Sequence, residues 1–261
     1  MKLTFPSVRA VMARRILVNF RVRPEVLQAM LPPPFFPKRI DGWGLAGICL
    51  IRIEQMRPAF LPAAFGVASE NAAHRIAVEW QNGAVRQEGV FIPRRDTDSL
   101  LNRVAGGRLF PGVHHPARFR TWDTDQQFNV ELWSRDGQVR VRVAARRTDR
   151  WPEGSLFDSL DRASAFLRRG CCGWSVGGNG GGLEGVELST DCWEMHALAV
   201  DLVESSFFAD ETLFPPGTVE FDSALLMLGI PHAWQALKPG SLAINGNKRE
   251  RPGRSALWEM P

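Results

Sequence analysis

The sequence predicts a mainly β protein with a few inserted helices (α+β), in which antiparallel strands form a closed or strongly curved sheet. Segments that alternate between apolar and polar residues dominate the chain, and short turn signals separate them. Nine tryptophans and 16 phenylalanines supply the bulk of a deep apolar interior. Helical patterns are few and short, and sheets with this composition can enclose a pocket.

The first part of the chain predicts two strands around one short helix. Residues 11–22 have strand character, and residues 42–58 predict a long, largely buried strand. Between them, Pro24 is expected to start a helix, since apolar residues recur behind it at helical spacing. The three prolines at 32–34 end that helix, because proline lacks a backbone donor.

A hairpin and a second helix follow. Residues 74–80 and 88–93 flank the turn-like stretch QNGA, which is a hairpin signal. Residues 98–107 predict a helix with an aspartate or serine at the N-cap and a glycine at the C-terminal end.

The second half of the chain predicts a meander, a third helix and a last strand. The helix at 158–170 has an N-cap serine or aspartate and ends on arginines, which suit the C-terminal dipole. Residues 219–234 are expected to form a strand that enters a short helix. The three alternating strands of the meander are predicted at 117–123, 128–134 and 139–147.

The composition predicts a single globular domain. No composition break divides the chain, so we expect one domain over residues 1–245 and a flexible basic tail over residues 246–261. The longest apolar run, at 45–51, is far shorter than a membrane span, and the first residues lack the apolar core of a secretory signal. No membrane partner is therefore expected.

The charge pattern argues against a nucleic-acid partner. The net charge is +4, and 28 acidic residues are interleaved with the 32 basic ones rather than separated from them. The expected surface is therefore mildly basic and soluble. The four cysteines show no CxxC spacing, and we interpret them as reduced thiols in a cytoplasmic protein. The oligomeric state stays open, with a homo-oligomer as one alternative.

Several catalytic and cofactor classes are disfavoured. The glycine-rich stretch at 173–185 has neither a preceding Val/Ile-rich strand nor a following helix start, so it predicts a flexible loop rather than a dinucleotide site. No GxSxG elbow and no tyrosine occur, which argues against that serine-hydrolase motif and against tyrosine acid chemistry. We expect no cofactor and no metal.

One group of candidate residues lies around the first strand of the hairpin. His74 alternates with apolar residues on one face, while Arg75 and Glu79 share the other face. An ion pair without function is the ordinary interpretation of Arg75 and Glu79. Glu70 is expected in the segment leading into the strand, where catalytic residues more often lie, and it is the candidate acid or base.

A second group follows the hairpin. The chain is expected to leave the sheet at Pro93, and Arg94 and Arg95 then come near Glu70 if the two strands pair. Arginines beside a carboxylate can bind an acidic ligand. His114 and His115 are candidate ligand-binding residues, but adjacent residues on a strand face opposite ways and cannot both reach one metal.

The adjacent cysteines Cys171 and Cys172 leave two alternatives open. They follow two arginines, which lower the pKa of a thiol and would favour a nucleophile. The favoured interpretation is that they are small apolar filler near a glycine loop.

Several segments together resemble the uncharacterised bacterial YqjF-like proteins, described as domain of unknown function 2071. The resemblance covers residues 9 to 237 and keeps the order of the segments. The segments are RILVNFRVRPEVLQAMLPPPFFP, GICLIRIEQMRP, SENAAHRIAVEW, GVFIPRRDTDSLLNRVAGGRLFPGVHH, FLRRGCCGWS, SSFF and VEFDSALLMLGIPHAW.

This resemblance implies the acetoacetate-decarboxylase-like fold, a curved, closed sheet around a cavity. The more distant decarboxylases use a pair of lysines, one of which forms a Schiff base. Arg94 and Arg95 stand where that pair would fall, and no lysine lies near them in the sequence. Arginine cannot form the Schiff base, so imine chemistry is not implied for this chain. Glu70 matches a cavity glutamate of those enzymes.

Two functions remain as hypotheses. One is an enzyme in which Glu70 acts as acid or base while Arg94 and Arg95 hold a carboxylate or an enolate. The other is a module that binds a small acidic or apolar ligand in the same cavity without turnover. Glu70→Gln separates them, because it abolishes turnover but spares affinity in an enzyme.

Overall fold

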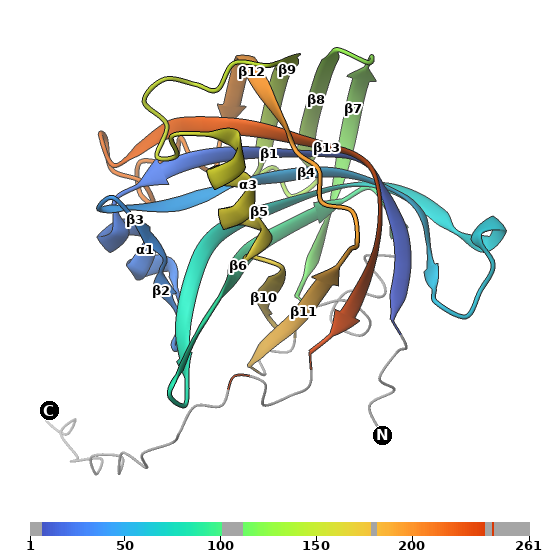
Figure 1. The fold of residues 1–261 in the computed structure, drawn as a ribbon, viewed down its shortest axis with the longest axis horizontal. Helices are drawn as coiled ribbons and strands as arrows, with labels where there is room; N and C mark the ends of the chain where they lie inside the picture. The colour runs from blue at the N-terminus through green and yellow to red at the C-terminus, as the bar shows by residue number, and fades with distance from the viewer. Residues whose placement is uncertain (1–6, 101–111, 179–181, 238–241, 243–261) are drawn as a thin grey trace, which may run out of the picture.

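A computed structural model describes residues 7–100, 112–178, 182–237 and 242 (Figure 1). Most of these residues lie in strands, which confirms the predicted mainly β class. No helix among the described residues has the length and apolar character needed to cross a membrane. The predicted tail at 246–261 lies outside the described residues, as does most of the helix predicted at 98–107.

The strands form one sheet that closes on itself twice, which confirms the predicted curved, closed architecture. Both closures share five long strands in the order β13-β1-β4-β5-β6. One closure, the first ring, continues from β6 through β7, β8, β9 and β12 back to β13. The other, the second ring, continues from β6 through β10 and β11 to β13. The five shared strands are β1 (Val8–Val22), β4 (Trp43–Pro58), β5 (Val67–Asn82), β6 (Val85–Thr97) and β13 (Val219–Ala236).

Short elements complete the architecture. The strands outside the shared set are β2 (Phe36–Pro37), β3 (Arg39–Ile40), β7 (His114–Asp123), β8 (Gln127–Ser134), β9 (Arg140–Thr148), β10 (Cys172–Val176), β11 (Leu183–Ser189) and β12 (His196–Ser205). The helices are α1 (Pro24–Met30), the 3-10 turn η1 (Ala63–Phe65) and α3 (Leu160–Arg168).

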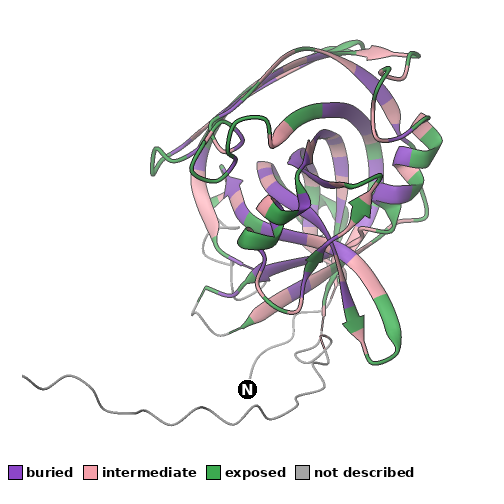
Figure 2. Ribbon diagram, turned by 90° about the vertical axis from the view of Figure 1, so that its left-hand side faces the viewer, coloured by how far each residue is buried: buried purple, intermediate pink, exposed green. Residues whose placement is uncertain are grey.

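Each shared strand is buried on both faces, so the molecule has two apolar cores. The larger core includes Ile16, Ile48 and Leu226 and lies inside the first ring. The smaller core contains Leu17 and Leu225 from the opposite face of the same strands, and Phe166 of α3 packs against them. Figure 2 shows the buried residues along the strands and the exposed residues mostly in the connections. Because successive side chains point to opposite faces, each shared strand contributes to both cores.

Several local predictions are confirmed. Helix α1 begins at Pro24, and the strands of the hairpin are joined at Gly83, whose φ is +63°. The meander of β7, β8 and β9 is antiparallel throughout. Helix α3 begins after Ser159, whose side chain accepts a hydrogen bond from the backbone N–H of Arg162, as an N-cap does.

Four predictions about local structure are wrong. The glycine-rich stretch at 173–185 is not a loop throughout, because its two ends belong to β10 and β11, which pair with each other. The chain does not leave the sheet at Pro93, because a bulge lets β6 continue to Thr97. Residues 219–234 contain no helix, since the apolar run is a strand buried between the two rings. The sheet is also not purely antiparallel: β6 pairs in parallel with β7 and with β10.

Strands β1 and β4 approach each other closely at Gly47. A Cβ atom placed there would lie 2.2 Å from the backbone oxygen of Val18. Gly47→Ala is therefore expected to lower the free energy of unfolding by about 1–3 kcal/mol, because the backbone must shift. Urea unfolding of this variant and of Gly178→Ala, where the nearest atom lies at 3.6 Å, tests the prediction. Equal stability of the two variants would contradict it.

Candidate functional site

The adjacent residues Arg94 and Arg95 lie on opposite faces of β6. Arg94 is paired with His74 across the strands, and Arg95 with Ala73. Directly opposite residues share a face and neighbouring residues do not. Arg94 therefore faces the first ring with His74, whereas Arg95 faces the second ring.

Arg94 has a full set of acidic and polar partners. Its guanidinium donates to Asp96 at 2.8 Å, to Asp136 at 2.9 Å and to the amide oxygen of Gln138 at 3.1 Å. Burial lowers the pKa of Arg94, but Asp96 and Asp136 outweigh burial and raise it. His115 lies on the same side, with its Nδ1 3.4 Å from Asp136. Arg94 is thus neutralised by the protein itself and has little capacity left for a ligand.

His74 is buried among aromatic rings of the first ring. Its ring lies 4.5 Å from that of Phe207, and the residue has no exposed surface. Burial, together with the charge of Arg94, lowers the pKa of His74 to about 3. The imidazole is therefore neutral in the folded protein at physiological pH.

Glu70 lies inside β5, not in a segment before it, and forms a buried ion pair. The Nη2 of Arg14 is 2.6 Å from Glu70, and the Nη1 of Arg14 is 2.5 Å from Asp123. The pKa of Glu70 is raised by burial, against the opposing charges of Arg14 and Arg52. The backbone carbonyl of Glu70 accepts from the backbone N–H of Asp98, and the backbone N–H of Glu70 donates to the side-chain carboxylate of Asp98. The hairpin therefore does not bring Glu70 beside Arg94 or Arg95. Its role as acid or base stays a prediction.

Arg95 faces a pocket of about 100 Å³ inside the second ring. Its Nε lies 3.3 Å from the hydroxyl of Ser175. Its Nη2 is enclosed and has no hydrogen-bond partner among the residues that the structure describes. Burial lowers the pKa of Arg95 to about 10, with Cys49 opposing the change, so the guanidinium is still protonated at neutral pH. The largely apolar walls include Ile51, Ile53, Met56, Val186 and Trp234.

Arg75 faces the second ring as well, and 4 % of its surface is exposed. Its Nη2 donates to the side-chain oxygen of Asn19. The amide Nδ2 of Asn19 donates to the hydroxyl of Ser223 at 3.2 Å, and that hydroxyl donates to Asp222 at 2.8 Å. The predicted Arg75–Glu79 pair does not form, because Glu79 binds Arg86. Burial lowers the pKa of Arg75 to about 10. Among the described residues, the direct hydrogen-bond partner of the Arg75 guanidinium is the neutral side-chain amide of Asn19.

Arg15 and Lys38 line a small recess of about 30 Å³ together with Arg75. Arg15 donates to the sulfur atoms of Cys49 at 3.3 Å and Met227 at 3.7 Å, which are weak acceptors. Lys38, which is distant from Arg94 and Arg95 in the sequence, pairs with Glu88 and lies 3.9 Å from the ring centre of Phe166. Burial lowers the pKa of Lys38 against Glu88. Cationic side chains thus outnumber the single carboxylate that lines the recess.

His114 is aligned with Arg95 in the parallel pairing of β6 and β7 and lines the same pocket. Burial, followed by the charge of Arg95, lowers the pKa of His114 to about 3. His115 lies on the other face beside Asp136, as the alternation predicts. Among the described residues, no group of three histidine, cysteine or acidic side chains is arranged to hold a metal.

The structure favours the filler interpretation of Cys171 and Cys172. Burial raises the pKa of both thiols, and Glu187 adds to the rise, which brings Cys172 to about 11. The neighbouring arginines do not outweigh burial, so neither thiol is activated.

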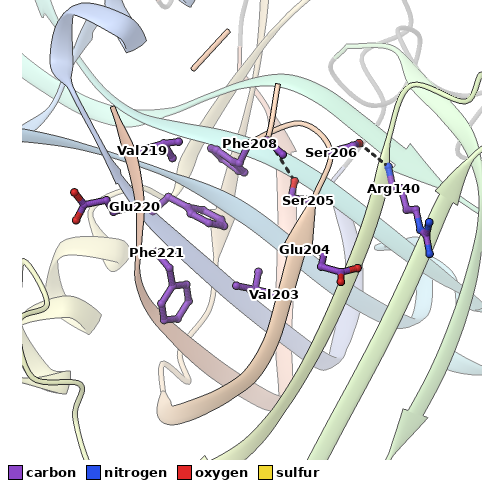
Figure 3. Close-up of a pocket in the computed structure, with 11 residues that line it drawn as sticks. Arg140, Val203, Glu204, Ser205, Ser206, Phe208, Val219, Glu220 and Phe221 are labelled. Atoms are coloured by element: carbon purple, nitrogen blue, oxygen red, sulfur yellow. Dashed lines mark hydrogen bonds between the residues drawn. The ribbon is translucent and has the colours of Figure 1, made fainter. Parts of the chain in front are cut away.

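A larger groove of about 460 Å³ lies between β12 and β13 (Figure 3). These strands pair through three residues and then diverge. Apolar side chains, including Phe20, Phe208 and Phe221, line the groove. Its acidic residues Glu204 and Glu220 already pair with Arg142 and Arg21. Arg140, the other charged residue of the lining, is exposed to solvent, so the described part of the groove holds no buried charge without a partner.

Comparison with known proteins identifies the family. The profile of the family described as domain of unknown function 2071, an uncharacterized conserved protein, matches residues 9–223. The chain belongs to this family. No curated protein matches the sequence.

Solved structures with the same fold are acetoacetate-decarboxylase-like proteins. Acetoacetate decarboxylase from Legionella pneumophila has a TM-score of 0.58 at 12% identity, over 90% of this chain and 88% of that one. An acetoacetate decarboxylase-like enzyme from Sphingomonas wittichii RW1 has a TM-score of 0.52 at 15% identity, over 88% and 89% of the two chains.

The enduracididine biosynthesis enzyme MppR, in complex with pyruvate, has a TM-score of 0.54 at 15% identity, over 90% of this chain and 89% of that one. Similarity at this level shows that the family has the acetoacetate-decarboxylase-like fold.

Sequence reasoning missed two residues of the second ring, Arg15 and Cys49. Both lie in strands that carry buried apolar residues on both faces. The alternation of the sequence therefore does not show which face a polar residue occupies there. The available signal was the pair of arginines, Arg14 and Arg15, inside the otherwise apolar run at 10–18. The structure shows that one forms an ion pair in the first ring and the other faces the second ring.

Proposed function

We propose that the protein binds a small carboxylic acid inside the second ring, with the carboxylate on Arg95. The observation that supports this is the enclosed Nη2 of Arg95, which has no hydrogen-bond partner among the described residues. A buried cation without a counter-charge is costly, and a carboxylate matches the two-nitrogen edge of a guanidinium. The neighbouring pocket of about 100 Å³ has mainly apolar walls that suit the carbon chain of a short acid.

The geometry supports a role for Arg95 rather than Arg94 as the anion-binding residue. Asp96 and Asp136 occupy the guanidinium of Arg94, so a ligand carboxylate would have to displace them. Neither arginine can form an imine, and Lys38 already pairs with Glu88. The proposed function is therefore binding of an organic acid in a fold that related enzymes use for small keto acids.

Arg95→Gln is expected to weaken binding of the acid about tenfold to a hundredfold, the value of a hydrogen bond to a charged group. Unliganded stability should stay the same or rise, because the variant removes a partly buried cation whose Nη2 has no hydrogen-bond partner among the described residues. A thermal-shift screen with acetoacetate, pyruvate, lactate and benzoate selects a ligand, since binding raises the melting temperature by mass action. Calorimetry then measures the affinity.

Arg118→Gln is the matched control, because Arg118 is exposed on β7 and does not line the pocket. Its affinity should equal that of the unmodified protein. Unchanged affinity in Arg95→Gln, or no binding of any acid in the panel, would overturn the proposal.

A further inference from the structure

Cys49 lies near the middle of the face that carries the three arginines. Ala73 separates it from Arg95 along one row of paired residues, since Cys49 is opposite Ala73 and Ala73 is opposite Arg95. Arg75 is opposite Gly47, two residues along β4 from Cys49. The small residues Ala73 and Gly47 leave the space above this part of the sheet to the long side chains around it.

One guanidinium contacts the sulfur of Cys49, and two more interact with it only electrostatically. Arg15 donates from Nε to Sγ at 3.3 Å. Arg75 and Arg95 interact electrostatically with Cys49, which opposes the effect of burial on their pKa values. The Nε of Arg75 is enclosed and has no hydrogen-bond partner within the described residues. The face thus presents a thiol together with polar donors that no protein acceptor satisfies.

Cys49 also lies between the two hollows of the second ring. Ile51 and Ala73, its neighbours along and across the strands, line the pocket at Arg95. Arg15, which contacts its sulfur, lines the recess that holds Arg75 and Lys38. A short acid whose carboxylate rests on Arg95 would therefore lie against Ile51 and Ala73, the direct neighbours of Cys49.

We infer that Cys49 is a nucleophile for a small electrophilic carboxylate held by Arg15, Arg75 and Arg95. The inference rests on the proposed function and adds a reactive group to it. With a 2-oxo acid, the sulfur forms a bond to the keto carbon while the carbon–oxygen π bond breaks. The thiol proton passes to that oxygen, so the product is a hemithioacetal and no oxidant is needed. Guanidiniums stabilise the negative charge that develops on the oxygen.

Competition between iodoacetate and iodoacetamide tests the inference in the full chain. Both reagents alkylate a thiol with loss of iodide and a proton, and they differ in carrying a carboxylate or a neutral amide. Cys49 is expected to react about tenfold faster with iodoacetate, because a cationic cleft concentrates an anion. Peptide mass spectrometry follows each cysteine. Cys172, beside Glu187, and the exposed Cys192 are internal controls that should react faster with iodoacetamide, whereas Cys171 is left out because Arg15 and Arg168 act on it.

Two further measurements separate the inference from the proposed function. Pyruvate should slow the alkylation of Cys49 and leave that of Cys192 unchanged. Arg15→Met should abolish the preference of Cys49 for iodoacetate. If Cys49 reacts with neither reagent until the protein is unfolded, or prefers iodoacetamide, the inference fails. In that case, binding of a carboxylate at Arg95, measured by calorimetry, would still support the proposed function. If no acid in the panel binds, the proposed function itself is overturned.

Discussion

Arg14→Met is expected to lower the free energy of unfolding by about 3–5 kcal/mol, the cost of breaking a buried ion pair from one side. Arg14 is 2 % exposed and is the shared partner of Glu70 and Asp123. Methionine fills much of the volume, so the loss comes mainly from Glu70, which stays buried with Arg52, at 3.9 Å, as its remaining cation. Urea unfolding at neutral pH measures the difference.

The double variant Arg14→Met/Glu70→Gln is the control for this prediction. It removes the stranded charge as well, so it should recover most of the stability lost in Arg14→Met. A double variant as unstable as the single one would show that packing, not charge, decides the effect. Because Glu70 faces the first ring, Glu70→Gln should also leave carboxylate binding at Arg95 unchanged, in contrast to the sequence-based hypothesis of a shared site.

The free energy of unfolding is expected to fall by about 2–3 kcal/mol between pH 6.5 and pH 4.5 through His74 alone. The pKa of His74 is about 3 in the folded protein, against 6.5 without burial. The unfolded chain therefore binds a proton over this range while the folded protein does not. The stabilisation is complete above pH 6.5 and is lost as the pH falls toward 3. His232, whose pKa burial lowers to about 4, adds to the same trend.

The variant His74→Leu measures how much of the pH dependence of the free energy of unfolding comes from His74. Neither ring nitrogen of His74 has a hydrogen-bond partner among the described residues, so leucine should be tolerated at neutral pH. The variant should lose less stability between pH 6.5 and pH 4.5, by about the same 2–3 kcal/mol. Urea unfolding at several pH values gives both curves. Parallel curves for the two proteins would contradict the prediction.

Local signals predicted most of the elements. The alternation of residues 117–123, 128–134 and 139–147 was sufficient for the meander, because a half-buried strand imposes a period of two. The N-cap at Ser159 and the helix start at Pro24 depend on neighbouring residues alone. The apolar run at 219–234 was assigned partly to a helix, since a strand buried on both faces loses its alternation.

The candidate site was predicted less well, because its chemistry depends on faces and partners. The sequence placed Arg94 and Arg95 together just beyond the end of a strand, yet the pleat of β6 directs them into different rings. Whether the guanidinium of each arginine is free to bind a ligand depends on residues far away in the sequence. Asp136 neutralises Arg94 from a turn 42 positions away, while Ser175 offers Arg95 a neutral hydroxyl.

The amino-acid sequence by itself determined the mainly β class, the closed sheet, the hairpin, the meander and the family. These follow from periodicity, turn chemistry and segment order, which are local or additive along the chain. Only the tertiary structure decided that the sheet closes twice and that Arg15, Arg75 and Arg95 gather around Cys49. The physical reason is that register, a bulge and the parallel pairing of β6 select the face of every side chain, and a shift of one residue reverses that choice.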